Sequence, residues 1–262
     1  MSMRDPSRRI VDFKMDLSAL LLHFDKAKPG GSDSDYFIDS SRHNHTIARS
    51  GANVVIGAEN KFPAGSLKGP SGVDKAFWRV HQGLNMDADF TFDFWFFDSG
   101  YGGTYGSDLS SMSVRLGYDN WPIGKSYLSN VLEIYTEDRA GDAQGYLHCV
   151  FYAIYGGQLG TVIPINSGYW KHIAFVKHNN THSLYLNGAL IEQWTANTNF
   201  TAWWWAPPFE HYNYDPAYNP EHSITLNCAT TTSKPIYIDE VHLEARALWK
   251  GPFTPSAEPY RG

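Results

Sequence analysis

The alternation of apolar and polar residues is most regular between Tyr169 and Gln193. Two apolar runs, Ile173–Val176 and Leu184–Leu186, are separated by a polar segment, His178–Ser183. The second run alternates with period two, which is typical of a strand with one buried face. Asn187-Gly188 follows and tolerates the two positive φ angles of a type I′ turn. We therefore predict a β-hairpin meander here.

The segment Asp89–Phe97 carries the strongest single strand pattern in the chain. Four phenylalanines fall on one face and the intervening residues on the other. The four are Phe90, Phe92, Phe94 and Phe96. Burying each ring contributes about 1.5–3 kcal/mol before conformational entropy is subtracted, so we expect this strand at the centre of a sheet.

Further strand patterns occur along the whole chain. They are Leu17–Phe24, His45–Arg49, Asn53–Ile56, Phe77–Val80, Met112–Tyr118, Val131–Thr136, Tyr146–Tyr155, Thr161–Ile165, Ser223–Asn227 and Ile236–Leu243. In the last of them the alternation slips at Asp239-Glu240, which predicts a β-bulge. No long helical pattern and no repeat is evident, so we expect one all-β domain.

Four stretches, in this order, resemble one known family. They are LLLHFDKAKPG…FIDSSRHNHTIARSG at Leu20–Gly51, FTFDFWF at Phe90–Phe96, WKHIAFVK…SLYLNGALI from Trp170, and IYIDEVHLEARALW at Ile236–Trp249. Together they resemble the laminin-G-like jelly rolls of the concanavalin A-like lectin/glucanase superfamily. The resemblance implies a sandwich of two antiparallel sheets over residues 17–250. The opening LLLHFD and the ending FTPSAEPY are similar to the variant found in bacteriophage virion proteins, often in tails.

The two ends of the chain have compositions unlike the strands. Residues 1–16 are polar and predict an extended arm, and residues 251–262, with three prolines, predict an extended tail. The cations of the arm are a solvated tail or contacts to an acidic protein neighbour. They are Arg4, Arg8, Arg9 and Lys14. The arm has no apolar core of signal-peptide length, so we expect the protein to stay in the cytosol until virion assembly or lysis.

Charge and cysteine content narrow the functions further. A formal net charge of −6 disfavours a nucleic-acid groove, which needs a basic face. No apolar segment is long enough to span a bilayer, so we expect no membrane contact. The two cysteines, Cys149 and Cys228, are either buried free thiols or a pair that only the fold brings together.

Catalysis requires residue patterns that this chain lacks. Retaining glucanases need two carboxylates about 5 Å apart on one strand face. Asp239, Glu240 and Glu244 come nearest, but adjacent strand residues point to opposite faces. The pairs His43 with His45 and His172 with His178 have no Cys or clustered carboxylate beside them that would complete a metal set. We therefore expect no enzymatic activity and no obligatory cofactor.

The segment 197–222 interrupts the strand pattern with four prolines and many aromatic residues. Its candidate binding residues are Trp203, Trp204, Trp205, Tyr212, Tyr214 and Tyr218. These rings stack on sugars, anchor a protein neighbour, or fold back over the open end of the sandwich. Loop oxygens of related lectins bind calcium, and the resemblance makes four residues candidate ligands. They are Asp98, Asp108, Asp215 and Asn219.

Together these features favour a non-catalytic virion structural or accessory protein, in head decoration or in the tail. Its lectin-like domain would serve assembly or adhesion to host glycans. The expected partners are further capsid or tail proteins and other copies of the chain. A soluble carbohydrate-binding protein and a glycoside hydrolase are the alternatives.

Overall fold

The computed structural model describes residues 18–24, 38–41, 43–44, 47–50, 55–56, 59–62, 65–68, 76–82, 88–100, 111–119, 129–138, 145–152, 158–195, 221–229 and 236–260. These residues form fifteen strands, β1 to β15. None of the described residues belongs to a helix that is long and apolar enough to cross a membrane.

Eight strands make up the first sheet, which we call sheet A. They are β1 (Ser18–Leu22), β3 (Val55–Ile56), β4 (Leu67–Lys68), β6 (Phe90–Asp98), β11 (Trp170–His178), β12 (Thr181–Leu186), β13 (Ala189–Thr195) and β15 (Ile236–Glu244). The order across the sheet is β13-β12-β11-β6-β15-β4-β3, and β1 pairs with β15. The strand with the four phenylalanines, β6, lies between β11 and β15, which confirms its predicted central position.

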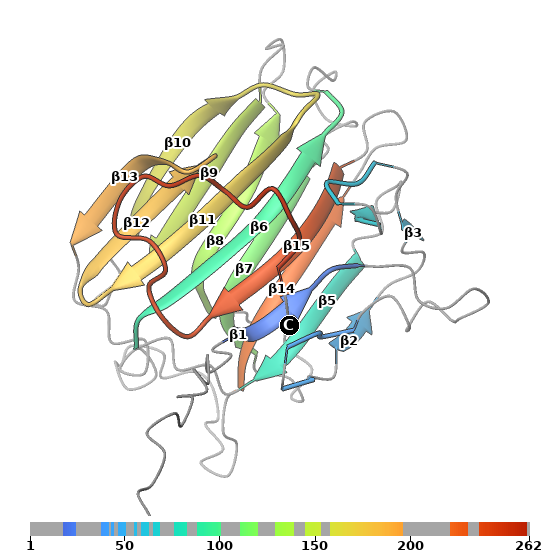
Figure 1. Ribbon diagram of the computed structural model, residues 1–262, viewed down its shortest axis with the longest axis horizontal. Coiled ribbons are helices and arrows are strands. Elements are labelled where there is room, and N and C mark those ends of the chain that lie inside the picture. Colours follow the sequence, from blue (N-terminus) through green and yellow to red (C-terminus); the bar gives the residue numbers. More distant parts are fainter. Residues whose placement is uncertain are drawn as a thin grey trace, which may run out of the picture.

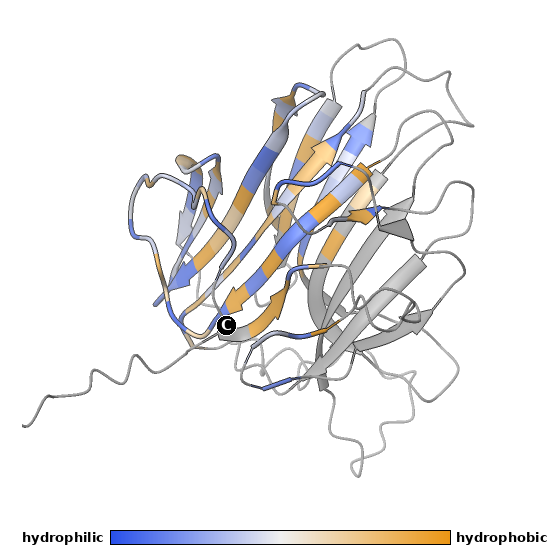
Figure 2. Cartoon of the chain, turned by 45° about the vertical axis from the view of Figure 1, so that its right-hand side comes forward, coloured by the Kyte–Doolittle hydropathy of each residue, from blue (hydrophilic) through white to orange (hydrophobic). Residues whose placement is uncertain are grey.

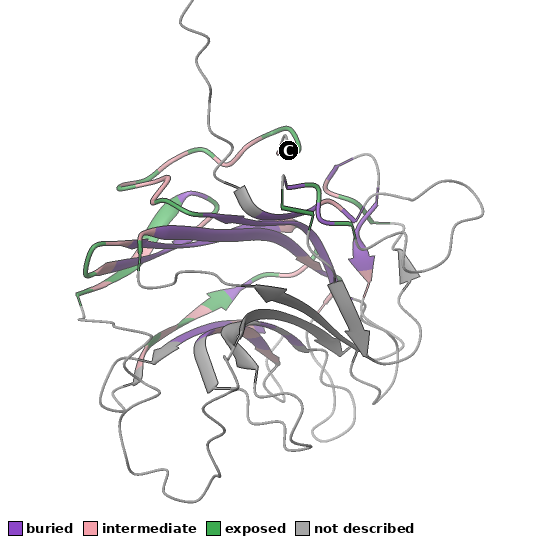
Figure 3. Cartoon of the chain, turned by 90° about the horizontal axis from the view of Figure 1, so that it is seen from below, coloured by how far each residue is buried: buried purple, intermediate pink, exposed green. Residues whose placement is uncertain are grey.

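Seven strands make up the second sheet, sheet B. They are β2 (Ile47–Ser50), β5 (Ala76–Gln82), β7 (Ser111–Asp119), β8 (Ser129–Asp138), β9 (Gly145–Tyr152), β10 (Gln158–Ile165) and β14 (Glu221–Ala229). Their order is β10-β9-β8-β7-β14-β5-β2, and all pairs are antiparallel. The sheets lie face to face (Figures 1 and 3), so the predicted all-β sandwich of two antiparallel sheets is confirmed.

The core lies between the sheets. Residues at alternate positions of β6, including Phe92 and Phe94, are fully buried against residues of sheet B such as Leu132 and Ile134. The alternation of hydrophobic and hydrophilic residues along the strands is visible in Figure 2. Cys149 is a buried free thiol in this core, and burial raises its pKa.

The predicted turn and bulge are both present. Asn187 and Gly188 connect β12 to β13 with φ angles of 51° and 80°, as a type I′ turn requires. The pairing of β15 with β6 shifts register between Asp239 and His242, and Glu240 has a φ angle of 50°. This bulge directs the Glu240 side chain away from the regular alternation.

The segment 245–260, which we call the strap, leaves β15 and crosses the outer face of sheet A (Figures 1 and 3). It contains no strand. Its Trp249 and Phe253 pack on a small apolar cluster of the sheet that includes Val176 and Tyr185. The outer face of the central strands β6, β11 and β15 is therefore also buried, whereas β13 at the edge of the sheet is largely exposed.

Candidate functional site

Most of the predicted site residues lie outside the described part of the chain. These are Arg4, Arg8, Arg9, Lys14, Asp108, Trp203, Trp204, Trp205, Tyr212, Tyr214, Asp215, Tyr218 and Asn219. Their predicted roles in sugar, partner or calcium binding stay predictions.

Asp98 is the one calcium candidate that is described. It is buried at the end of β6, and Lys171 Nζ lies 2.7 Å from its Oδ2 atom. The same ammonium lies 4.2 Å from the ring centroid of Tyr169. Burial lowers the pKa of Lys171, and the Asp98 charge partly offsets this. Among the described residues, no three His, Cys, Asp or Glu side chains are arranged to hold a metal ion.

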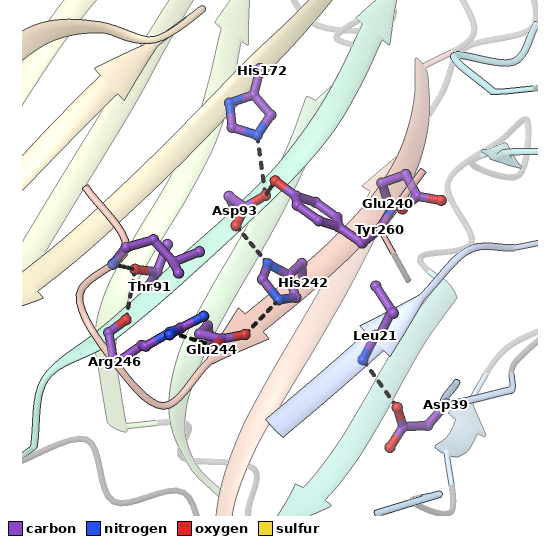
Figure 4. A network of polar contacts seen from close by, with 11 residues as sticks. Leu21, Asp39, Thr91, Asp93, His172, Glu240, His242, Glu244, Arg246 and Tyr260 are labelled. Atoms are coloured by element: carbon purple, nitrogen blue, oxygen red, sulfur yellow. Dashed lines mark hydrogen bonds and ion pairs between the residues drawn. The ribbon is translucent and has the colours of Figure 1, made fainter. Parts of the chain in front are cut away.

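A network of polar side chains lies instead on the outer face of sheet A, centred on Asp93 of β6 (Figure 4). The Oδ1 atom of Asp93 accepts hydrogen bonds from His172 Nε2 at 3.1 Å and from the Tyr260 hydroxyl at 2.7 Å. Its Oδ2 atom accepts one from His242 Nδ1 at 2.9 Å. One fully buried carboxylate therefore joins β6, β11, β15 and the end of the strap.

The charges in this network stabilise one another. Burial alone would raise the pKa of Asp93, but the His242 charge and the two histidine hydrogen bonds lower it to about 2. Burial alone would lower the pKa of His242, but Asp93 and Glu244 raise it to about 9. Since both His242 nitrogens face carboxylates, at 2.9 Å and 3.2 Å, the ring donates twice and is an imidazolium. Burial and the Asp93 charge raise the pKa of Tyr260.

The carboxylate of Glu240 connects both ends of the described chain. Its Oε1 atom lies 2.6 Å from Nδ1 of His23, beyond β1, and its Oε2 atom accepts the backbone N–H of Tyr260 at 3.1 Å. The Tyr260 ring also stacks on His242, with centroids 4.3 Å apart. The bulge explains this arrangement, because it places Glu240 between β1 and the strap.

Asp239, on the other side of the bulge, holds the segment that precedes β4. Its Oδ2 atom accepts the N–H groups of Lys61 at 3.1 Å and Phe62 at 3.4 Å, and its Oδ1 atom that of Glu240 at 2.9 Å. Burial and the Glu240 charge raise the pKa of Asp239 to about 8, against the lowering by these N–H donors. This carboxyl group therefore binds backbone rather than facing a substrate.

The arrangement is a set of contacts that ties the strap to sheet A. We call Asp93, His172, Glu240, His242, Glu244 and Tyr260 the clasp. A general base needs a nitrogen that can take a proton from a nucleophile, and both nitrogens of His242 are engaged by carboxylates. Within the described residues, neither clasp histidine has a hydrogen bond to a Ser, Thr or Cys side chain. What the clasp does is hold the strap on the sheet.

Sequence reasoning did not single out the clasp residues as a unit. The alternation correctly places Asp93 on the polar face of β6, but a polar face on a strand usually indicates solvent. The available signal was a charged residue, Asp93, in the middle of the polar face of a central strand. A charged residue that becomes covered requires a partner.

Comparison with known proteins identifies the fold. No family model and no curated protein matches this chain. Solved structures with a similar fold include the botulinum neurotoxin serotype D binding domain, with a TM-score of 0.55 and 12% identity over 89% of this chain. The chain spans 49% of that protein.

Two carbohydrate recognition domains are also similar. That of Emp47p has a TM-score of 0.51 and 11% identity, covering 89% of this chain and 96% of the domain. That of Emp46p, in its metal-free form, has a TM-score of 0.50 and 11% identity, covering 77% and 89%. At these identities the likeness concerns the fold alone. The chain has a concanavalin A-like, lectin-type jelly-roll fold.

Proposed function

We propose that this chain is a non-catalytic, lectin-like protein of a bacteriophage virion, a head decoration or tail component for assembly or surface adhesion. The observation that carries the proposal is a contact between two stretches, LLLHFD and FTPSAEPY. Both stretches are similar to phage virion variants of the domain. His23 of the first and Tyr260 of the second bind the same Glu240 carboxylate. The two stretches therefore form one structural unit.

The described acids and histidines support a non-catalytic role. Asp93, Asp239, Glu240 and Glu244 are all buried and bind residues of the same chain. Acids that cleave glycosidic bonds must instead face each other across a substrate. In this proposal the four buried carboxylates stabilise the fold, and residues on the protein surface bind the ligand or partner.

Glycan adhesion is the form of binding that the fold favours. The Emp47p and Emp46p relatives by fold are carbohydrate recognition domains, and the segment 197–222 supplies rings suited to stacking on sugars. Binding to other virion proteins through the same rings or through the arm 1–16 is part of the same proposal. A soluble carbohydrate-binding protein is the second candidate, since the fold supports it equally.

Incorporation into particles separates the two candidates. The full chain, with a short epitope tag, would be produced in cells during phage infection, and purified particles would be probed for it. The proposal expects the chain in particles, and less of it after deletion of residues 1–16. A chain found only in the soluble fraction, with glycan-array binding that Trp204→Ala removes, would favour the soluble lectin. Tyr169→Ala, at a ring with 42% of its surface exposed, is the matched control.

A further inference from the structure

Hydrogen bonds hold the strap at its two ends, and ring packing holds its middle. At the first end, the Thr91 hydroxyl donates to the Arg246 carbonyl and accepts the Leu248 N–H, both at 2.8 Å. At the second end, Tyr260 binds Asp93 and Glu240. Between them, the described backbone contact is Phe253 N–H to the Gly188 carbonyl at 2.9 Å. The contacts of the middle are therefore separate from the polar contacts that hold the two ends.

The Phe253 ring holds this middle section on the sheet. It lies between Tyr185, at 5.4 Å between ring centroids, and His172, at 5.8 Å. Trp249 stacks on it in parallel at 3.8 Å. The backbone approach is so close that a Cβ atom at Gly188 would lie 1.8 Å from the Phe253 carbonyl oxygen. The site of the Phe253 ring is therefore bordered by Tyr185, His172 and Trp249, and the Phe253 backbone lies against Gly188.

Two polar atoms around this site have no hydrogen-bond partner in the described part of the structure. They are the Tyr185 hydroxyl and Nδ1 of His172, and both side chains are fully buried. Nε2 of His172 donates to Asp93, which leaves Nδ1 as the second polar atom of the ring. Unpaired buried polar groups are rare and costly in folded proteins. The Phe253 ring contacts the rings that carry these two atoms, and a phenyl group offers neither of them a hydrogen bond.

We propose that residues 249–256 are a displaceable cover over a sugar-binding site, in which a pyranose ring takes the place of the Phe253 side chain. One sugar hydroxyl would form a hydrogen bond with His172 Nδ1 and another with the Tyr185 hydroxyl. A strap from a second copy would bring the same phenyl ring and leave both atoms unpaired, so a hydroxyl-bearing ligand fits better. The proposal rests on the lectin-like function above and adds a site outside the segment 197–222.

The unpaired state of Tyr185 is tested first, by thermal unfolding. Tyr185→Phe in the full chain is expected to leave Tm unchanged or to raise it, because the removed hydroxyl has no partner. Tyr260→Phe, which removes a hydroxyl bonded to Asp93, is the matched control and is expected to lower Tm. A comparable fall for both variants would show that the Tyr185 hydroxyl is already paired, for instance by a buried water, and would overturn the proposal.

Binding is tested with the methyl glycosides of glucose, galactose and mannose, by ligand-observed NMR. Phe253→Ala is expected to bind at least one of them about tenfold more tightly than the unmodified chain, the effect of one good hydrogen bond. Adding Tyr185→Phe should abolish the gain, and Thr254→Ala on the same strap should not produce it. A folded Phe253→Ala variant with no gain would overturn the proposal. Particle incorporation and the effect of Trp204→Ala do not depend on this site, so they report on the proposed function separately.

Discussion

Both faces of β6, a central strand of sheet A, are buried, but different interactions hold them. The inner face of β6 packs Phe92 and Phe94 into the hydrophobic core. The outer face of the same strand carries Asp93, which is just as inaccessible but bonds to two histidines and Tyr260. The inner face is stabilised by the area removed from water, which does not depend on pH. The outer face depends on a few charged pairs, so single polar atoms and pH should matter there.

The largest effect is expected on the inner face. Phe94→Ala removes a fully buried ring from the centre of the core and should lower the free energy of unfolding by about 3–5 kcal/mol. Chemical denaturation followed by tryptophan fluorescence measures this. A loss below about 1 kcal/mol would mean that the two sheets are not packed as described.

On the outer face, Asp93→Ala is expected to cost about 3 kcal/mol, because it leaves the His242 charge and the Tyr260 hydroxyl buried without their acceptor. The control is Asp89→Ala, which removes a similar carboxylate from a partly exposed pair with His178 at 2.6 Å. Exposed pairs contribute about 0–1 kcal/mol. Equal losses in the two variants, measured by urea unfolding, would argue against a buried clasp.

The pH dependence should come from the outer face and from His182, a buried residue of β12. The pKa of His242 is raised from 6.5 to about 9, so its contribution is complete below pH 6.5 and is lost as pH rises through 9. The pKa of Asp239 is raised from 3.8 to about 8, so this group also lowers the stability as pH rises, between about 3.8 and 8. Burial and then the Lys177 charge lower the pKa of His182 to about 4, so stability falls as pH drops from 6.5 through 4.

Thermal unfolding across pH 4–10 is therefore expected to show little net change in Tm between about pH 4 and 6.5, where the effects of His182 and Asp239 oppose each other, and a falling Tm from about 6.5 to 9. His242→Gln should flatten the alkaline side of this profile and leave the acid side. An unchanged alkaline side in that variant would remove His242 from the explanation.

The smallest effect is expected for Tyr260→Phe, which keeps the ring stacked on His242 and removes one hydrogen bond to a carboxylate. The expected loss is about 1.5 kcal/mol. Hydrogen exchange should speed up at the amides of Leu248 and Phe253 in the strap and stay unchanged in β11. Uniform exchange changes across sheet A would instead mean that the strap does not open as a separate unit.

The same comparison shows why sequence predicted one face and not the other. The inner face follows from alternation alone, because apolar residues at every second position of a central strand point to the same side and are buried in the core. The hairpin turn at Asn187-Gly188 and the bulge at Glu240 were predictable for a similar local reason, since each requires a particular backbone geometry. These features depend on neighbours within a few residues.

The outer face depends on contacts between distant segments. Asp93 and Tyr260 are separated by 167 positions, and His23 and Glu240 by 217. A proline-containing tail predicts extended chain but not the surface on which it lies. For this reason the clasp emerged from the structure, whereas the candidate residues of the segment 197–222 remain predictions from sequence.

The central claim is that the polar face of sheet A forms a buried clasp that holds the strap. The titration of His242 tests it most directly, by ¹⁵N NMR of the imidazole nitrogens in the full chain. The account predicts a pKa of about 9, because Asp93 and Glu244 hold the protonated ring. A pKa near the ordinary value of 6.5 would show that the ring is solvated or unpaired, and would contradict the clasp.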